Sequence, residues 1–220
     1  NHQLPSEPTT SMVLGVNLPA TSTKPGPTTG DEVLTLEYFD NLGKSQDLDV
    51  TFSPTVPAVA PASNEWTMQV RDRAQGGALI GEATLAFQDT PGAGGTIGTV
   101  TASTGTYDAA TGNLTIAASS GPIAMTIGRP GGYGAMTQLS DSFAPGAIQK
   151  NGAPPGNIVQ VDIDQNGMVN ALFDTGITRT LYQVPLADVP NPNGLIALDN
   201  QAYRPSNTSG AFFLWDAGTG

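Results

Sequence analysis

The run Leu172-Phe173-Asp174-Thr175-Gly176 carries the residue types that could support carboxylate chemistry. An aspartate on a glycine-turned loop suits an aspartic protease, in which two facing aspartates share one proton and activate a water. The two other Asp-Thr or Asp-Ser pairs lack the glycine, because Asp89-Thr90 continues into proline and Asp141-Ser142 into phenylalanine. A dimeric aspartic protease needs one Asp-Thr-Gly run per chain and a downstream apolar-apolar-Gly segment that supports the loop. The only similar run, Leu79-Ile80-Gly81, lies upstream. A tight turn between two strands explains the same residues and is the favoured interpretation.

The spacing of Asp162, Asp164, Asn166 and Gly167 matches the opening of a calcium-binding loop. Such a loop needs a bidentate glutamate at its twelfth position, which falls on Phe173 in this sequence. A hairpin turn with Gly167 in a left-handed conformation explains the same residues without a metal.

Other candidate sites fail for lack of a required partner. The glycine-rich run at 128–134 has no Gly-Lys-Ser/Thr ending and no predicted helix after it to hold a phosphate. His2 is the only histidine, which argues against a Ser–His–Asp triad or a histidine metal site. No spacing among the 19 acidic residues singles out a glycosidase pair. We therefore predict no catalytic, cofactor-binding or metal-binding residues and no enzyme activity.

Aromatic residues leave a binding alternative open. A sugar-binding platform could be built from Trp66, Tyr133, Tyr203 and Trp215. Packing in the core or at an interface is the favoured role for such residues. The alternative class is accordingly a secreted carbohydrate-binding or adhesin β-module.

Composition limits the partners. The net charge is −11, and the 8 basic residues stand singly, so neither nucleic acid nor an anionic membrane surface is an expected partner. The absence of cysteine removes disulfides and thiol chemistry. No run reaches the ~18 apolar residues of a spanning helix, and no cleavable signal opens the sequence. We expect an excised fragment.

Alternation of apolar and polar residues predicts an all-β fold. The trio Leu48, Val50 and Phe52 marks one inward face, and Trp66, Met68 and Val70 mark another. Further strands are expected near 12–18, 33–39, 79–87, 97–101, 113–117 and 122–127. Turns roughly ten residues apart are typical of an antiparallel sandwich or barrel, and the lack of a 3.6-residue period predicts almost no helix.

Two irregular zones, at 19–30 and 128–157, predict the domain organisation. We expect an inserted β-barrel or sandwich domain over 31–150, and a second, discontinuous β-rich domain formed by 1–30 and 151–220. In the second domain, a hairpin should place Val159, Val161 and Ile163 on one face, with Val169, Ala171 and Phe173 returning beyond the turn.

The end of the sequence combines an Asp-x-x-Gly hairpin with an Ala-x-x-x-Asn-x-x-Gly-Leu element. These motifs are Asp164 to Gly167, and Ala187, Asn191, Gly194 and Leu195. They closely resemble the segment shared by bacterial flagellar rod and hook proteins, most of all the hook protein. The resemblance is strongest over 158–210 and looser at 12–20 and 31–52, and the large insert favours the hook over the rod.

The resemblance implies a structural role. It implies a subunit of the flagellar hook, the flexible joint that transmits motor torque to the filament, which assembles with itself through open heterologous contacts. Rod and hook–filament junction proteins would be its neighbours. The implied location is extracellular, after export without a cleaved signal peptide. Because the long terminal helices of the family are missing, the 220 residues alone should be monomeric.

Overall fold

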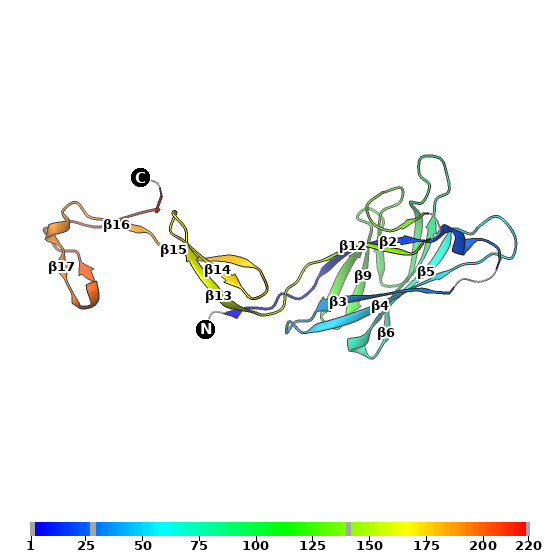
Figure 1. Ribbon diagram of the computed structural model, residues 1–220, viewed down its shortest axis with the longest axis horizontal. Coiled ribbons are helices and arrows are strands. Elements are labelled where there is room, and N and C mark those ends of the chain that lie inside the picture. Colours follow the sequence, from blue (N-terminus) through cyan, green and yellow to red (C-terminus); the bar gives the residue numbers. More distant parts are fainter. Residues whose placement is uncertain (1–2, 27–29, 140–141, 219–220) are drawn as a thin grey trace. The chain divides into compact units, whose positions relative to one another are not determined.

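The computed structural model describes residues 3–26, 30–139 and 142–218. They form two compact units, a larger unit of Pro5–Pro155 and a smaller unit of Asn1–Leu4 with Gly156–Gly220 (Figure 1). Nearly all regular structure is strand, which confirms the predicted all-β class. The helices in the described residues are short 3₁₀ turns, namely η1 (Ala20–Thr23), η2 (Arg73–Gln75), η3 (Pro192–Gly194) and η4 (Asp199–Gln201). Within these ranges, no helix has the length and apolar character needed to cross a membrane.

One sheet of the larger unit is a meander in which each strand pairs with the next in sequence. Its order is β3 (Glu32–Phe39), β4 (Ser45–Pro54), β5 (Glu65–Asp72), β6 (Ala78–Phe87) and β7 (Ile97–Thr104). All four pairings are antiparallel. This order is the natural one for strands that follow each other in sequence, because consecutive antiparallel strands can be joined without a crossover connection.

The second sheet of the larger unit joins both ends of its sequence range. Its order is β11 (Thr137–Gln138), β2 (Ser11–Leu18), β10 (Gly121–Thr126), β9 (Asn113–Ala118) and β8 (Thr106–Asp108), and β12 (Ala144–Lys150) also pairs with β2. Strand β2 runs parallel to β10 and β11 and antiparallel to β12. The sheet is therefore mixed, whereas the sequence predicted an antiparallel domain.

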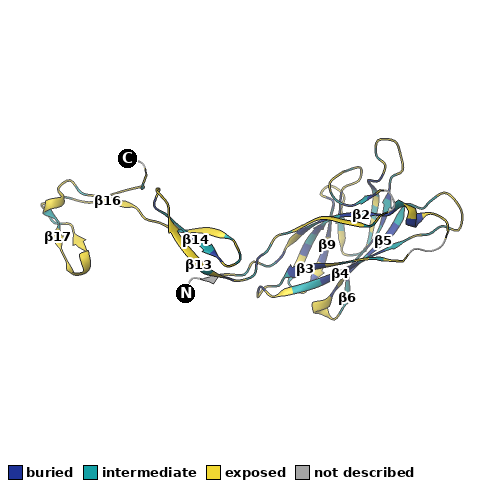
Figure 2. Cartoon of the chain, viewed as in Figure 1, coloured by how far each residue is buried: buried dark blue, intermediate teal, exposed yellow. Residues whose placement is uncertain are grey.

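The two sheets enclose one apolar core (Figure 2). Both predicted inward trios, starting at Leu48 and at Trp66, are fully buried, which confirms the alternation in β4 and β5. The sheets approach closely, since a Cβ on Gly81 of β6 would lie 2.7 Å from Ile116 Cγ2 of β9. Each large side chain buried here contributes about 1.5–3 kcal/mol of transfer free energy.

The observed units differ from the predicted domain boundaries, which placed residues 1–30 with 151–220. Strand β2 belongs to the larger unit through its pairings with β10, β11 and β12. Thr9 also lies in the larger unit, is 1% exposed and donates from Oγ1 to the carbonyl of Asn151. The zone 128–157 was expected to be irregular, but it contains strands β11 and β12. Residues 27–29 of the other zone, 19–30, lie outside the described residues.

The smaller unit has three small sheets. The first has the order β1 (Gln3–Leu4), β13 (Gly156–Ile163), β14 (Met168–Phe173) and β15 (Thr178–Gln183). The others pair β16 (Leu186–Asp188) with β19 (Phe213–Trp215), and β17 (Ile196–Ala197) with β18 (Tyr203–Arg204). Among the residues whose burial is described, the buried apolar residues of its core cluster are Ala171 and Phe173. This unit therefore has a much smaller core than the larger one.

Candidate functional site

The Asp-Thr-Gly run forms the turn between β14 and β15. Gly176 has a positive φ of 81°, and its N–H donates to the carbonyl of Phe173 at 2.9 Å. The carboxylate of Asp174 accepts from the backbone N–H of Asn157 at 3.0 Å and from its side-chain amide at 3.1 Å. Both hydrogen bonds hold the pKa of Asp174 below its ordinary value, and the bond from the backbone N–H makes the larger contribution. The carboxylate thus binds a neighbouring backbone group at the strand turn, which is the structural role expected of an aspartate in a tight turn.

The calcium-like motif forms the hairpin between β13 and β14. Asp164 Oδ1 accepts the backbone N–H groups of Asn166 and Met168, both at 2.9 Å. Gly167 has a φ of 73°, which confirms the predicted left-handed turn. The carboxylate oxygen thus binds the chain's own backbone, which is the usual role of aspartate in an Asx turn.

The glycine-rich loop at 128–134 follows β10 and is bound to its neighbours by backbone contacts. The N–H of Gly131 donates to the carbonyl of Ile97 at 2.8 Å, and the Tyr107 hydroxyl donates to the carbonyl of Gly128 at 2.8 Å. The next regular element is the two-residue strand β11, not a helix. The loop therefore lacks a helix N-terminus at which a phosphate could bind.

The four candidate aromatic residues do not form one exposed row. Trp66 is fully buried in the core of the larger unit, and its indole N–H donates to Gln138 Oε1 at 2.8 Å. Tyr133 of the same unit is 69% exposed, while Tyr203 and Trp215 are exposed in the smaller unit. Trp66 is thus a core residue, as the favoured interpretation predicted.

Three acidic residues of the larger unit, Asp47, Asp49 and Glu37, form ion pairs with basic side chains. Arg73 contacts Asp49 through two nitrogens, each at 2.7 Å, and reaches Asp47 at 3.2 Å. Across residues 3–26, 30–139 and 142–218, no group of three or more His, Asp or Glu side chains could hold a metal ion. His2 lies outside the described residues.

A second ion pair joins the two sheets of the larger unit. Lys150 of β12 donates to Glu37 of β3 and lies 4.3 Å from the centre of the Phe39 ring. The hydrogen bond from Lys150, followed by one from Ser45, holds the pKa of Glu37 below its ordinary value of 4.5.

Lys150→Met is expected to raise the pKa of Glu37 toward 4.5, because the largest cause of the lowered value is removed. Ser45→Ala should raise it less. Since the folded pKa is the lower one, the stabilisation is present above the ordinary pKa and is lost as the pH falls through the folded value. An NMR titration of the Glu37 side-chain carboxyl measures these shifts. A midpoint unchanged by Lys150→Met would contradict the contact.

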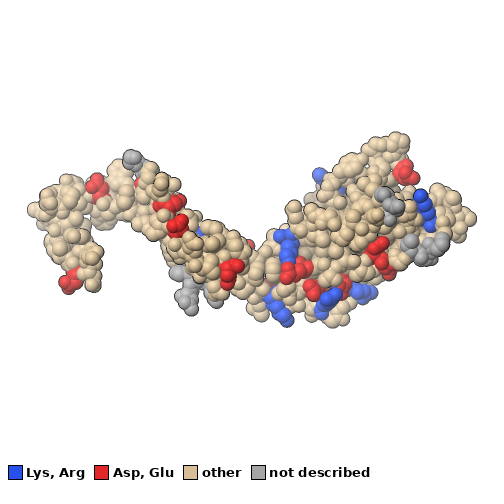
Figure 3. All heavy atoms as spheres, in the orientation of Figure 1, with Lys and Arg blue, Asp and Glu red and all other residues tan. Residues whose placement is uncertain are grey.

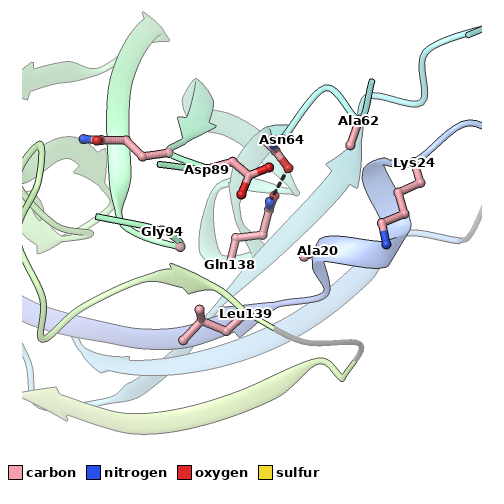
Figure 4. A pocket seen from close by; sticks show the side chains of 10 residues that line it. Ala20, Lys24, Ala62, Asn64, Asp89, Gly94, Gln138 and Leu139 are labelled. Carbon is pink, nitrogen blue, oxygen red and sulfur yellow. Dashed lines mark hydrogen bonds between the residues drawn. The ribbon is translucent and has the colours of Figure 1, made fainter. Parts of the chain in front are cut away.

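A cavity of about 390 Å³ with polar and apolar lining residues lies in the larger unit (Figure 4). Its lining includes Lys24 and Asp89, the charged residues of the set. The amide of Gln138 bonds Asn64 at 2.8 Å, and its oxygen bonds Trp66, so both groups of this side chain serve the fold. The remaining lining residues are Ala20, Ala62, Gln88, Gly94, Gly95 and Leu139. The set holds no nucleophile paired with a base, and it provides no catalytic arrangement.

The most connected polar group of the larger unit is the buried carboxylate of Asp72, which sequence reasoning missed. Both of its oxygens lie 3.0 Å from the hydroxyl of Tyr38. It also accepts from the backbone N–H of Ala74 and of Ser119 and from the Gln75 side-chain amide, at 2.9 to 3.0 Å. Asp72 occupies the next inward-facing position of β5. An acidic residue at an inward position of a strand is the sequence feature from which this buried carboxylate could have been predicted.

The surface carries few charges, and both signs are interspersed (Figure 3). On the face drawn, lysines and arginines occur singly or beside acidic residues and form no continuous basic band. Such a surface does not follow a phosphate backbone.

The sequence matches the family described as flagellar basal body protein FlaE D2 domain over residues 8–153, a range within the larger unit. The flagellar hook protein FlgE of Brucella suis biovar 1 (strain 1330) is 29% identical over 207 residues, which cover 94% of this chain and 46% of that protein. The flagellar hook protein FlgE of Caulobacter vibrioides is 40% identical over 81 residues, 37% of this chain and 14% of that protein.

A crystal structure of the Helicobacter pylori flagellar hook protein FlgE2 aligns with 84% of this chain and 39% of that chain, at 14% identity and a TM-score of 0.45. The chain spans about half the length of the Brucella relative. The predicted resemblance to flagellar hook proteins is confirmed by the family match and these relatives. This chain belongs to the flagellar basal body protein FlaE D2 domain family.

Proposed function

We propose that this chain is part of a structural subunit of the bacterial flagellar hook and has no enzymatic activity. The observation that carries the proposal is the alignment of 94% of the chain with a flagellar hook protein, together with the family match over 8–153. In this proposal the subunit polymerises in the hook, outside the cell, and its neighbours include rod and hook–filament junction proteins. Export without a cleaved signal peptide belongs to the same proposal.

The two units suggest a division of labour within that subunit. The larger unit has its own core between two sheets and a sparsely charged surface, which suits an outer domain making weak polar contacts. The smaller unit carries the motifs shared with rod and hook proteins and is proposed as part of the inner β-domain. Open heterologous contacts between many copies would build the polymer. We expect the 220 residues alone to remain monomeric in sedimentation velocity.

Deletion of the gene in its source bacterium tests the proposal. We expect non-motile cells whose isolated basal bodies lack hooks in electron micrographs, and restoration of hooks and swimming by the complete gene. The matched control is the complete gene with Tyr133→Ala, which changes one exposed aromatic residue and should also restore hooks. Normal hooks in the deletion strain, combined with lost adhesion to glycans, would favour the carbohydrate-binding alternative instead.

A further inference from the structure

Three asparagines of this chain are followed directly by glycine, namely Asn151, Asn166 and Asn193. In such a pair the backbone nitrogen of the glycine can attack the side-chain carbonyl carbon of the asparagine, because glycine has no side chain to hinder the approach. A succinimide ring forms, and ammonia leaves with the side-chain nitrogen and the proton released by the glycine nitrogen. Water then opens the ring to aspartate or to isoaspartate, in which the chain continues through the side-chain carbonyl carbon.

The side chain of Asn151, directly after β12, is held by three hydrogen bonds to the residues where β2 begins. Its Oδ1 accepts from the backbone N–H of Thr10 at 2.8 Å and from that of Ser11 at 2.9 Å. Its Nδ2 donates to the Thr10 hydroxyl oxygen at 2.7 Å. Ring formation converts the planar side-chain amide into a tetrahedral group bonded to the next backbone nitrogen. Oδ1 and Nδ2 therefore cannot keep these three bonds while the ring forms.

The backbone around this asparagine is fixed as well. The carbonyl of Asn151 accepts from the Thr9 hydroxyl at 3.0 Å. Gly152 has a φ of 90°, and a Cβ there would lie 2.8 Å from the Glu7 carbonyl oxygen and from Thr9 Oγ1. Ala153 exchanges two backbone hydrogen bonds with Glu7, at 2.9 and 2.8 Å. The glycine that carries the attacking nitrogen is thus packed directly against the segment before β2.

The two other asparagines are held much less. Asn166 lies in the hairpin between β13 and β14, Asn193 lies in η3, and both are exposed. Within the described part of the chain, neither side-chain amide has a hydrogen-bond partner. The N–H of the glycine after each donates to a carbonyl of the same turn at 3.0 Å. Their side chains can therefore rotate without breaking contacts between distant segments.

The paired segments 7–11 and 149–153 join the two sequence ends of the larger unit, and we name them the clasp. We propose that Asn151 is a concealed deamidation site, whose reaction marks molecules in which the clasp has opened. While the clasp is closed the asparagine is shielded, and once the segments separate it reacts as in an unfolded chain.

The isoaspartate product prevents the clasp from closing again. It adds the Cβ atom to the backbone path and leaves a free carboxylate where the peptide carbonyl of Asn151 stood. That carbonyl accepts from Thr9, which is 1% exposed, so a changed backbone here leaves buried polar groups without their partners. The inference goes beyond the proposed function and does not depend on it.

Peptide mass spectrometry of the 220-residue chain tests the shielding. The chain is incubated in mildly alkaline buffer, once folded and once in guanidinium chloride, and the peptide around each Asn-Gly pair is followed with time. In guanidinium chloride the three sites should react at similar rates. In the folded chain Asn151 should react at least about tenfold more slowly than in the denaturant, and Asn193 should be slowed less. Equal rates at Asn151 in the two conditions, or equal slowing of both asparagines, would overturn the proposal.

A pair of threonine variants tests the hydrogen bonds of the clasp. Thr10→Val removes the acceptor of the Asn151 amide and keeps a side chain of similar shape, so it should raise the folded rate at Asn151 several-fold. The rate in guanidinium chloride should not change. The matched control is Thr35→Val, whose exposed hydroxyl bonds Asp49 at 3.0 Å, and it should alter neither rate. An unchanged folded rate in Thr10→Val would contradict the shielding.

Refolding tests the effect of the product. Asn166→Ser and Asn193→Ser are combined, so that residue 151 begins the single remaining Asn-Gly pair. This chain is partly deamidated in guanidinium chloride, refolded and digested briefly with a protease. Molecules with isoaspartate at position 151 should be digested first, and equal survival of both forms would overturn the second half of the proposal. The wild-type comparison needs no variant to fold, and its outcome is independent of hook assembly.

Discussion

Trp66→Ala is expected to lower the free energy of unfolding of the larger unit by about 3–5 kcal/mol, the range for a large buried aromatic side chain. Trp66 is fully buried and pairs across the sheet with Pro54 of β4 and Leu85 of β6. Its removal leaves a cavity between two sheets whose backbones are held by hydrogen-bonded ladders, so the site can collapse only partly.

The same substitution also removes a buried hydrogen bond. Gln138 is 5% exposed, and its Oε1 would lose the indole N–H donor 2.8 Å away. A buried acceptor without a donor adds about 1–3 kcal/mol to the loss when water cannot reach it. Because Gln138 also lines the cavity of about 390 Å³, water can reach the freed acceptor, and the total cost should stay within the range given for the aromatic side chain.

Urea unfolding followed by far-UV circular dichroism measures the Trp66 effect. Tyr133→Ala is the matched control, because this aromatic residue of the same unit is 69% exposed. It should change the free energy of unfolding by less than about 1 kcal/mol. A similar, small loss for Trp66→Ala would show that the core does not depend on the tryptophan.

Asp72→Asn is expected to lower the free energy of unfolding by about 2–4 kcal/mol, although the two side chains have nearly the same shape. The carboxylate is fully buried and accepts hydrogen bonds on both oxygens. An amide offers only one acceptor oxygen and places its N–H₂ group against another donor. Gln75 and Ser119 donate to one carboxylate oxygen, and Ala74 donates to the other. At least one of these donors would be left without an acceptor in the variant.

A double-mutant cycle with Tyr38→Phe tests whether Asp72 acts through this network. The Tyr38 hydroxyl lies 3.0 Å from both oxygens of Asp72 and 2.6 Å from Ser119 Oγ. Its loss should cost less in the Asp72→Asn variant than in the wild type, because the bond is already impaired there. Additive effects of the two substitutions would contradict the coupling. Asp108→Asn, at an exposed carboxylate that binds its own loop, is the matched control and should be better tolerated.

The local features of this protein follow directly from its sequence. Alternation along β4 and β5 predicts which side chains are buried, because successive side chains of a strand point to opposite faces. The hairpin at Asp164 to Gly167 follows in the same way, since turn chemistry acts over four residues. These predictions need no knowledge of distant parts of the chain.

Strand β12 shows where local reasoning fails. Pro145 and Gly146 are typical of a loop, yet they lie in a strand that pairs only with β2. Such an edge strand tolerates proline, and the register shifts between Pro145 and Ile148. The pairing also needs Gly15, where a Cβ would lie 2.8 Å from the carbonyl oxygen of Ala147.

The sequence by itself determined the all-β class, the main strands and their inward faces, and the turns, because each depends on neighbouring residues. Tertiary structure alone decided that β2 joins the larger unit, since its partners lie more than a hundred residues away. It also decided that Asp72 meets Tyr38 and Ser119, and that Val161 and Ile163 remain exposed. Each of these outcomes depends on which distant segments pack together, and the alternation of apolar residues carries no information about the partner of a face.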